Sequence, residues 1–209
     1  MNKPAFSSQA ALASAALAPA LGQSKTAAWF RAAGIVLLGS AFVAVCSHIA
    51  LPLWFTPVPL TLQPFSVLML GLLLTPRMAA ATLFAYLAEG AAGLPVFTPG
   101  LAFAVGFAHL FGPTGGYLLV YPVATFAVAA LWRRSRRTFA MALACAAVGN
   151  LLILLGGAAW LAAFAHLSLR SALTLAVLPF LPGDALKVAA AAALASGWTR
   201  LRRRASEGA

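Results

Sequence analysis

Acidic residues are nearly absent from this chain of 209 residues, which has three Asp and Glu against fourteen Lys and Arg. Charged residues of both signs make up only 8% of the sequence, whereas soluble domains carry about 25%. Hydrophobic residues make up 63%, and the mean hydropathy is +0.95. If the protein were soluble, a large part of the surface exposed to water would be apolar, which is unfavourable. The composition therefore excludes a soluble enzyme and predicts an all-α, polytopic membrane protein.

Cysteine is also scarce. Cys46 and Cys145 both lie inside apolar runs, which excludes a disulfide framework and a cysteine metal site. His48, His109 and His166 are far apart, and their spacing fits no metal-binding motif. The signatures of phosphate-binding loops, serine hydrolases and zinc proteases are missing as well. We therefore expect no metal, and any use of ATP must come from another protein.

Long apolar runs are what the chain does have. A membrane helix needs about 20 mostly apolar residues to cross the hydrocarbon core. The second of the six runs is short and is expected to borrow residues from 60–65. The predicted spans are Ala32–Ala50, Ser66–Thr75, Met78–Ala92, Gly116–Trp132, Thr138–Trp160 and Pro182–Trp198.

The basic residues lie on alternate connections between these spans. Twelve of the fourteen fall before the first span, between the second and third, between the fourth and fifth, and after the sixth. The other connections contain only Arg170, and Lys187 lies inside a span. The positive-inside rule assigns basic connections to the cytoplasm, so both termini are expected there. Because the basic residues are confined to these clusters, their distribution indicates membrane orientation and not nucleic-acid binding.

Three regions follow from these boundaries. Residues 1–30 are expected to form a flexible cytoplasmic leader, 31–201 a six-helix substrate-binding membrane domain, and 202–209 a basic cytoplasmic tail. The sequence Ala18-Pro19-Ala20 resembles a signal-peptidase site. Cleavage there would place Lys25 and Arg31 outside, against the charge rule, so an unremoved leader is favoured.

The two outer connections are rich in proline and glycine. Residues 51–63 contain three prolines, which predict a stiff, extended, apolar segment at membrane depth. Such a segment is either an interfacial linker, with Trp54 as an aromatic anchor, or a lid over a ligand pocket. Residues 93–117 carry the hydroxyls of Thr114 and Tyr117. They form either part of a pocket or a tight turn into the fourth span.

Two charges lie inside the membrane region. Asp184 and Lys187 are three residues apart and share one face of the sixth span. A charge at this depth is costly and usually marks a function, so the pair is either a structural salt bridge or an anchor for a small anionic ligand. Glu89 lies near the outer surface and is expected to be solvated. Ser40 and Ala44 are small residues four apart, a spacing that lets helices approach closely.

Four motifs, in order, resemble those of the BioY family, the biotin-binding S components of energy-coupling factor (ECF) vitamin transporters. The resemblance extends from about Arg31 to Leu201. The motifs are PVPLTLQ at 57–63, YLAEGAAGLPVF at 86–97, GPTGGYL at 112–118 and PGDALK at 182–187.

This resemblance implies an ECF S-component-like protein with six transmembrane helices, in the bacterial cytoplasmic (inner) membrane. It implies high-affinity binding and uptake of biotin, with no cofactor and no catalysis. The implied partners are a T component, contacted through Ser40 and Ala44, and ATPase subunits that use the ATP. Homo-oligomers are possible. The alternatives are a transporter of the same architecture for another vitamin, or an intramembrane enzyme that uses Asp184.

The resemblance also implies residue roles. Lys187 would lie near the valerate carboxylate of biotin and Asp184 near a ureido N–H, with the bicyclic ring among Trp54, Phe97 and Tyr117. The connection from Phe97 to Gly112 is longer and more apolar than in the family and has no Asn, and Leu118 stands where some members have Arg. Thr98, Thr114 and His109 are the candidates to substitute. The full ligand-binding set is Asp184, Lys187, Tyr117, Thr114, Phe97, Trp54, Gln63 and Tyr86.

Overall fold

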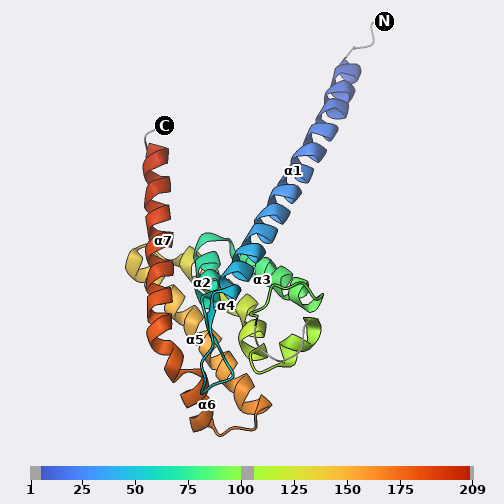
Figure 1. Ribbon diagram of the computed structural model, residues 1–209. Coiled ribbons are helices and arrows are strands. Elements are labelled where there is room, and N and C mark those ends of the chain that lie inside the picture. Colours follow the sequence, from blue (N-terminus) through green and yellow to red (C-terminus); the bar gives the residue numbers. More distant parts are fainter. Residues whose placement is uncertain (1–5, 100–105, 208–209) are drawn as a thin grey trace, which may run out of the picture. The chain divides into compact units, whose positions relative to one another are not determined.

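The computed structural model describes residues 6–99 and 106–207 and is helical throughout these ranges except for one short pair of strands and the connecting loops (Figure 1). The all-α prediction is thereby confirmed. In chain order the elements are α1 (Phe6–His48), β1 (Ala50–Leu51), β2 (Leu60–Thr61), α2 (Gln63–Leu73), α3 (Pro76–Ala91), the 3-10 helix η1 (Gly106–Phe111), α4 (Gly115–Arg134), α5 (Phe139–Phe164), α6 (Leu169–Ala176), the 3-10 helix η2 (Leu178–Phe180) and α7 (Leu181–Glu207).

Six of these helices, α1 to α5 and α7, correspond to the six predicted spans. Four helical stretches among the described residues are long and apolar enough to cross a membrane, and they contain α1, α4, α5 and α7. Helices α2 and α3 have 11 and 16 residues, which is fewer than the roughly 20 that a full crossing needs. The protein is therefore a membrane protein, and its helices α2 and α3 are shorter than a full crossing.

Several boundaries differ from the prediction. Helix α1 begins at Phe6, within the segment expected to be a flexible leader, because alanine-rich sequence has a high helix propensity. Helix α7 continues to Glu207, and the short helix α6 was not predicted. Ser168 starts α6 by accepting a hydrogen bond from the Ser171 N–H. The chain divides into two units, residues 1–35 and 36–209, and the second contains everything described below.

Helices α2, α4, α5 and α7 pack together around the core of the second unit. The contact between α4 and α5 depends on glycine at one close approach. A Cβ atom on Gly116 would lie 2.1 Å from Cβ of Trp160 and 2.7 Å from the Gly156 carbonyl oxygen. Only glycine leaves room for the two helices at this point.

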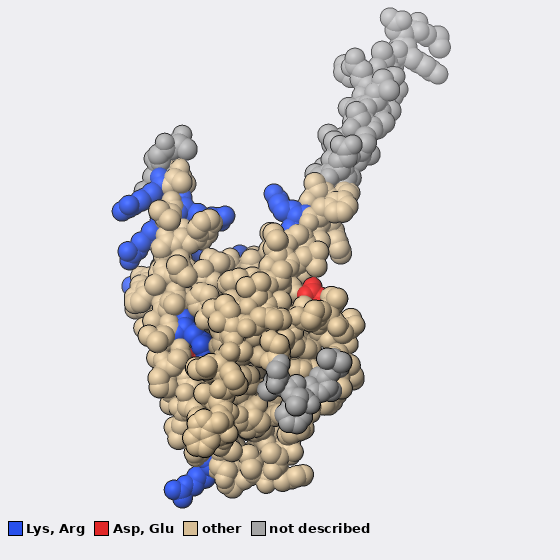
Figure 2. All heavy atoms as spheres, in the orientation of Figure 1, with Lys and Arg blue, Asp and Glu red and all other residues tan. Residues whose placement is uncertain are grey.

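Basic side chains gather on the C-terminal part of α7, whereas most of the remaining visible surface carries no charge (Figure 2). At the opposite end of this unit, α6 carries a basic residue near its start, the exposed Arg170. A surface band with few charges between charged ends is typical of a helix bundle embedded in a bilayer. The distribution thus agrees with the membrane assignment.

Candidate functional site

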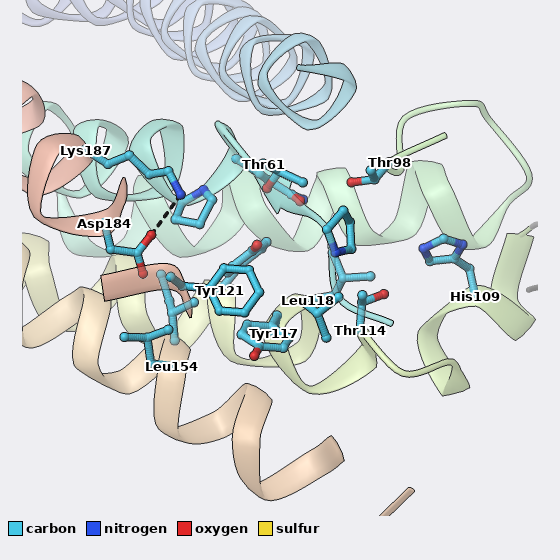
Figure 3. A pocket seen from close by; sticks show the side chains of 16 residues that line it. Thr61, Thr98, His109, Thr114, Tyr117, Leu118, Tyr121, Leu154, Asp184 and Lys187 are labelled. Atoms are coloured by element: carbon cyan, nitrogen blue, oxygen red, sulfur yellow. Dashed lines mark hydrogen bonds and ion pairs between the residues drawn. The ribbon is translucent and has the colours of Figure 1, made fainter. Parts of the chain in front are cut away.

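A cavity lies among α2, α4, α5 and α7, beneath the loop that joins α1 to α2 (Figure 3). It measures about 530 Å³, including the space at its mouth. Figure 3 shows the charged pair at one end, Thr98 and His109 toward the other, and Tyr117 and Tyr121 between them. The lining residues are Val58, Pro59, Thr61, Gln63, Pro64, Thr98, His109, Thr114, Tyr117, Leu118, Tyr121, Ile153, Leu154, Phe180, Asp184 and Lys187.

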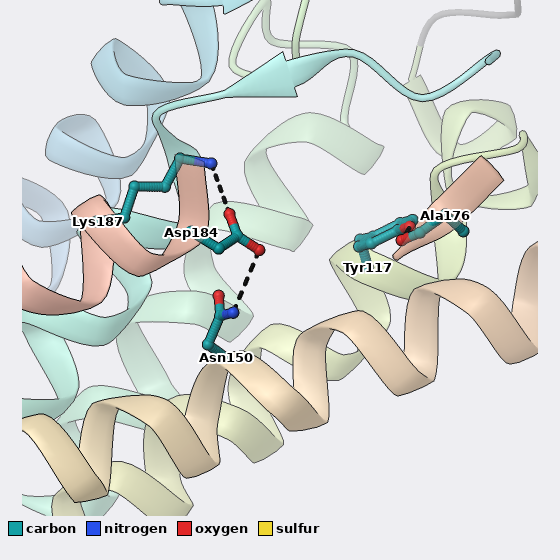
Figure 4. Close-up of polar contacts among 5 residues, drawn as sticks. All are labelled: Tyr117, Asn150, Ala176, Asp184 and Lys187. Atoms are coloured by element: carbon teal, nitrogen blue, oxygen red, sulfur yellow. Dashed lines mark hydrogen bonds and ion pairs between the residues drawn. The ribbon is translucent and has the colours of Figure 1, made fainter. Parts of the chain in front are cut away.

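The charged end of the cavity is built from α7 and α5 (Figure 4). Lys187 Nζ donates to Asp184 Oδ1 at 2.8 Å, and the two residues are 8% and 3% exposed. Asn150 Nδ2 on α5 donates to the other carboxylate oxygen, Oδ2, at 3.2 Å. Burying a charged pair is costly unless its remaining polar atoms are also satisfied. Here both carboxylate oxygens of Asp184 have a protein donor.

The proline-rich loop forms the roof. Strands β1 and β2 pair in antiparallel register, with Ala50 opposite Thr61, so the segment between them folds back as a hairpin. Val58 lies in the cavity wall, and Thr56 Oγ1 donates to the Leu175 carbonyl oxygen at 2.9 Å, which ties the loop to α6. The segment is non-helical, as the prolines predict, but it turns back on itself instead of being extended throughout. Its position favours a lid over a linker.

Trp54 does not line the cavity. It is 96% exposed and contacts the ring of Phe55 edge-on. Neighbours in this irregular loop point in different directions, and Trp54 takes an outward position typical of an interfacial anchor. Trp54, which was expected beside the bound ring, therefore lies outside the cavity wall.

The second outer connection contributes directly to the cavity. Thr114 and Tyr117 both line it, as do Thr98 and His109. The Tyr117 hydroxyl donates to the Ala176 carbonyl oxygen at 2.7 Å, which holds the end of α6 against α4 (Figure 4). The turn into α4 places these side chains in the wall, so the two interpretations of this segment are compatible.

Phe97 and Tyr86 lie one layer behind the wall. Phe97 stacks on His109, with ring centroids 4.9 Å apart, and meets Tyr86 edge-on at 5.5 Å. Gln63 lines the cavity, and its Nε2 donates to the Tyr86 hydroxyl at 2.8 Å. Of the eight residues expected to bind the ligand, the structure brings five to the cavity: Asp184, Lys187, Tyr117, Thr114 and Gln63.

Comparison with known proteins identifies the family. The model of the BioY family matches residues 11–204. The chain belongs to the BioY family. A probable biotin transporter BioY from Pyrococcus horikoshii is 39% identical over 161 residues, covering 77% of this chain and 91% of that protein. Biotin transporter BioY2 from Lactococcus lactis is 37% identical, covering 73% of this chain and 81% of that protein.

A solved structure supports the same assignment for this BioY-family chain. The crystal structure of the S component for biotin from an ECF-type ABC transporter aligns with a TM-score of 0.73 and 27% identity. The alignment covers 83% of this chain and 92% of that one. The chain therefore has the S-component fold, as its sequence motifs predict.

Ser40 and Ala44 face the interior of this BioY-family protein. Ser40 is fully buried and its hydroxyl donates to the Glu89 carboxylate, while Ala44 packs against the core. Glu89 is half-buried and not simply solvated. A carboxylate removed from water needs a donor, which explains why a serine hydroxyl faces it. Ser40 therefore offers no outer surface to a partner in this structure, whereas Ala44 is partly exposed.

Sequence reasoning missed Asn150 and four apolar or aromatic wall residues. Asn150 could have been found, because it is an uncharged amide in the middle of an apolar span, where polar groups are rare. Tyr121, Ile153, Leu154 and Phe180 carry no such signal, since aromatic and aliphatic side chains fill ordinary cores equally well. Within the described ranges, no group of three metal-ligating side chains is close enough to hold an ion.

Proposed function

We propose that this chain binds biotin in the cavity and acts as the substrate-binding S component of an ECF-type transporter, taking biotin up across the membrane. The observation that carries the proposal is the buried Asp184–Lys187 pair at one end of an otherwise largely apolar cavity. The relatives named as biotin transporters and the S component for biotin support it. A largely apolar pocket with a few placed polar groups is the usual design of a small-molecule site.

In this proposal the two ends of biotin lie at different points along the cavity. Its carboxylate and its ureido ring lie at opposite ends of the molecule, whereas Asp184 and Lys187 are in direct contact at 2.8 Å. One such pair is too compact to hold both ends of an extended ligand. We assign the carboxylate to Lys187, which has three N–H donors and uses one of them on Asp184.

Asp184 then has a different role from the one that its motif position suggests. Both of its oxygens are engaged, one by Lys187 and one by Asn150. Asp184 neutralises the buried ammonium when the cavity is empty and holds it in place, and Asn150 holds Asp184. The ureido ring then lies away from the charged pair, where Thr98 and His109 supply polar groups at the far end and Gln63 supplies an amide in the wall.

The transporter assembly follows from the same assignment. In this proposal the six helices lie in the bacterial cytoplasmic membrane with both termini cytoplasmic, and the roofed cavity then faces the outer side. A T component and ATPase subunits would supply the energy, since the sequence contains no phosphate-binding loop. Because Ser40 is engaged by Glu89, a T component would reach this stretch of α1 through the neighbouring exposed residues Ala41 and Val45.

A binding panel tests the proposal. Detergent-purified protein is titrated with biotin, thiamine and riboflavin by calorimetry, and the recovered ligand is examined by mass spectrometry. We expect saturable binding of biotin alone and its recovery unchanged. Preferential binding of thiamine or riboflavin would assign another vitamin, and chemical conversion of the ligand would indicate an enzyme.

A further inference from the structure

Gln63 is the first residue of α2, at the point where the roof of the cavity ends. It is 3% exposed and lines the cavity, while its amide nitrogen donates to the hydroxyl of Tyr86 on α3. Tyr86 is fully buried and is not among the lining residues. The side-chain amide thus lies between a buried tyrosine and the ligand cavity.

The hydrogen bonds of Tyr86 determine which way this amide points. A tyrosine hydroxyl has one hydrogen, and here it donates to the Val96 carbonyl oxygen at 2.9 Å. That oxygen can only accept, so the Tyr86 oxygen is left to accept from a neighbouring side chain. The Ser47 hydroxyl also lies beside Tyr86, but it donates to the backbone carbonyl oxygens of Ala44 and Val96, which leaves Gln63 as the donor. Gln63 therefore presents its NH2 group to Tyr86, at 2.8 Å, and turns its carbonyl oxygen away from Tyr86, toward the cavity.

The acceptor at the far end of this chain of hydrogen bonds is itself fixed. The Val96 carbonyl oxygen also accepts from Ser47 Oγ on α1 at 2.7 Å. The next residue, Phe97, lies over Gly90 so closely that a Cβ atom there would be 2.1 Å from its ring. Stacking of Phe97 on His109 completes the turn. The orientation of the Gln63 amide thus depends on side chains from three parts of the chain, of which only His109 lines the cavity.

We propose that Tyr86 is a positioning residue for ligand recognition. It holds the Gln63 amide so that the carbonyl oxygen accepts a hydrogen bond from an N–H of the ligand's ring system. The inference rests on the proposed function, because a ureido ring supplies such N–H donors. Without the Tyr86 hydroxyl the amide can rotate, and its NH2 group would then face the ligand's N–H, donor against donor.

A double-mutant cycle tests this role. Tyr86→Phe keeps the ring that meets Phe97 but removes the hydroxyl, so we expect affinity for biotin to fall about tenfold, the effect of losing one well-formed hydrogen bond in a buried site. Gln63→Met keeps the length of the side chain but has no amide to orient. In the Gln63→Met background, Tyr86→Phe should therefore change biotin affinity less than about twofold, because the two effects are coupled.

Tyr117→Phe is the matched control, because it removes a hydroxyl that donates to Ala176 and not to Gln63. Its effect on affinity should be the same in both backgrounds. The inference is overturned if Tyr86→Phe leaves biotin affinity unchanged, or weakens it equally in the wild-type and the Gln63→Met backgrounds, since a purely structural role of Tyr86 would act in both. Failure of the wild-type chain to bind biotin would instead contradict the proposed function, and the inference would fall with it.

Discussion

Removing one member of the buried charge pair should destabilise the protein more than removing both charges. Lys187→Met leaves Asp184 with only the Asn150 amide, and Asp184→Asn leaves Lys187 without its counter-charge. Breaking a buried pair from one side costs about 3–5 kcal/mol. For a chain of this size, about 2–4 °C of melting temperature is lost per kcal/mol. Each single variant should therefore melt roughly 6–20 °C below the wild type.

The double variant Asp184→Asn with Lys187→Met contains no buried charge. Replacing a whole buried pair by neutral groups is often close to neutral for stability, so it should melt above either single variant. The assay is thermal unfolding by tryptophan fluorescence, without ligand and in one detergent. Arg170→Met is the control, because Arg170 is exposed and its loss should cost no more than about 0.5 kcal/mol. Single effects that simply add in the double variant would refute the buried-pair account.

Three further substitutions test, one by one, the packing of α4 against α5, the roof of the cavity and the exposed position of Trp54. Gly116→Ala should lower the free energy of unfolding by about 1–3 kcal/mol in the same melting assay, because the new methyl group meets Trp160. An unchanged melting temperature would contradict the close approach of α4 to α5. Thr56→Val removes the hydrogen bond to the Leu175 carbonyl oxygen and should speed biotin dissociation several-fold in stopped-flow measurements, about the effect of losing one hydrogen bond. An unaltered rate would show that this bond does not hold the lid. Trp54→Ala should change biotin affinity less than about twofold by calorimetry, as is usual for exposed positions, and a large loss would place this tryptophan on the ligand.

The fold was largely readable from the sequence, because bilayer thickness and the cost of burying charge leave few choices for apolar runs separated by basic clusters. Helix ends were less predictable. The hydropathy pattern near α7 stops at Trp198, but the arginine-rich turns beyond it are good helix formers and continue to Glu207. Helix α6 was missed because it has only eight residues, too few to produce a span-like signal.

The charged residues of the site were predictable from the sequence, because burying a charge in the membrane is costly. The uncharged residues around them were not. Asp184 and Lys187 were identifiable because charges in an apolar span need a reason. Their spacing alone did not show that Asn150 completes the group, since that contact joins residues 34 positions apart on different helices. Tyr86 and Phe97 were expected on the ligand, but the structure places them behind Gln63 and His109, which no one-dimensional pattern distinguishes.

The most direct test of the account compares biotin with biotin amide, which lacks the carboxylate charge, on wild-type protein and on Lys187→Met. If Lys187 binds the carboxylate, the substitution should weaken biotin about tenfold or more, as expected for a hydrogen bond to a charged group, and weaken the amide less than about threefold. Calorimetry on variants shown to be folded gives both affinities. An equal loss for the two ligands would contradict the assignment of the carboxylate to Lys187.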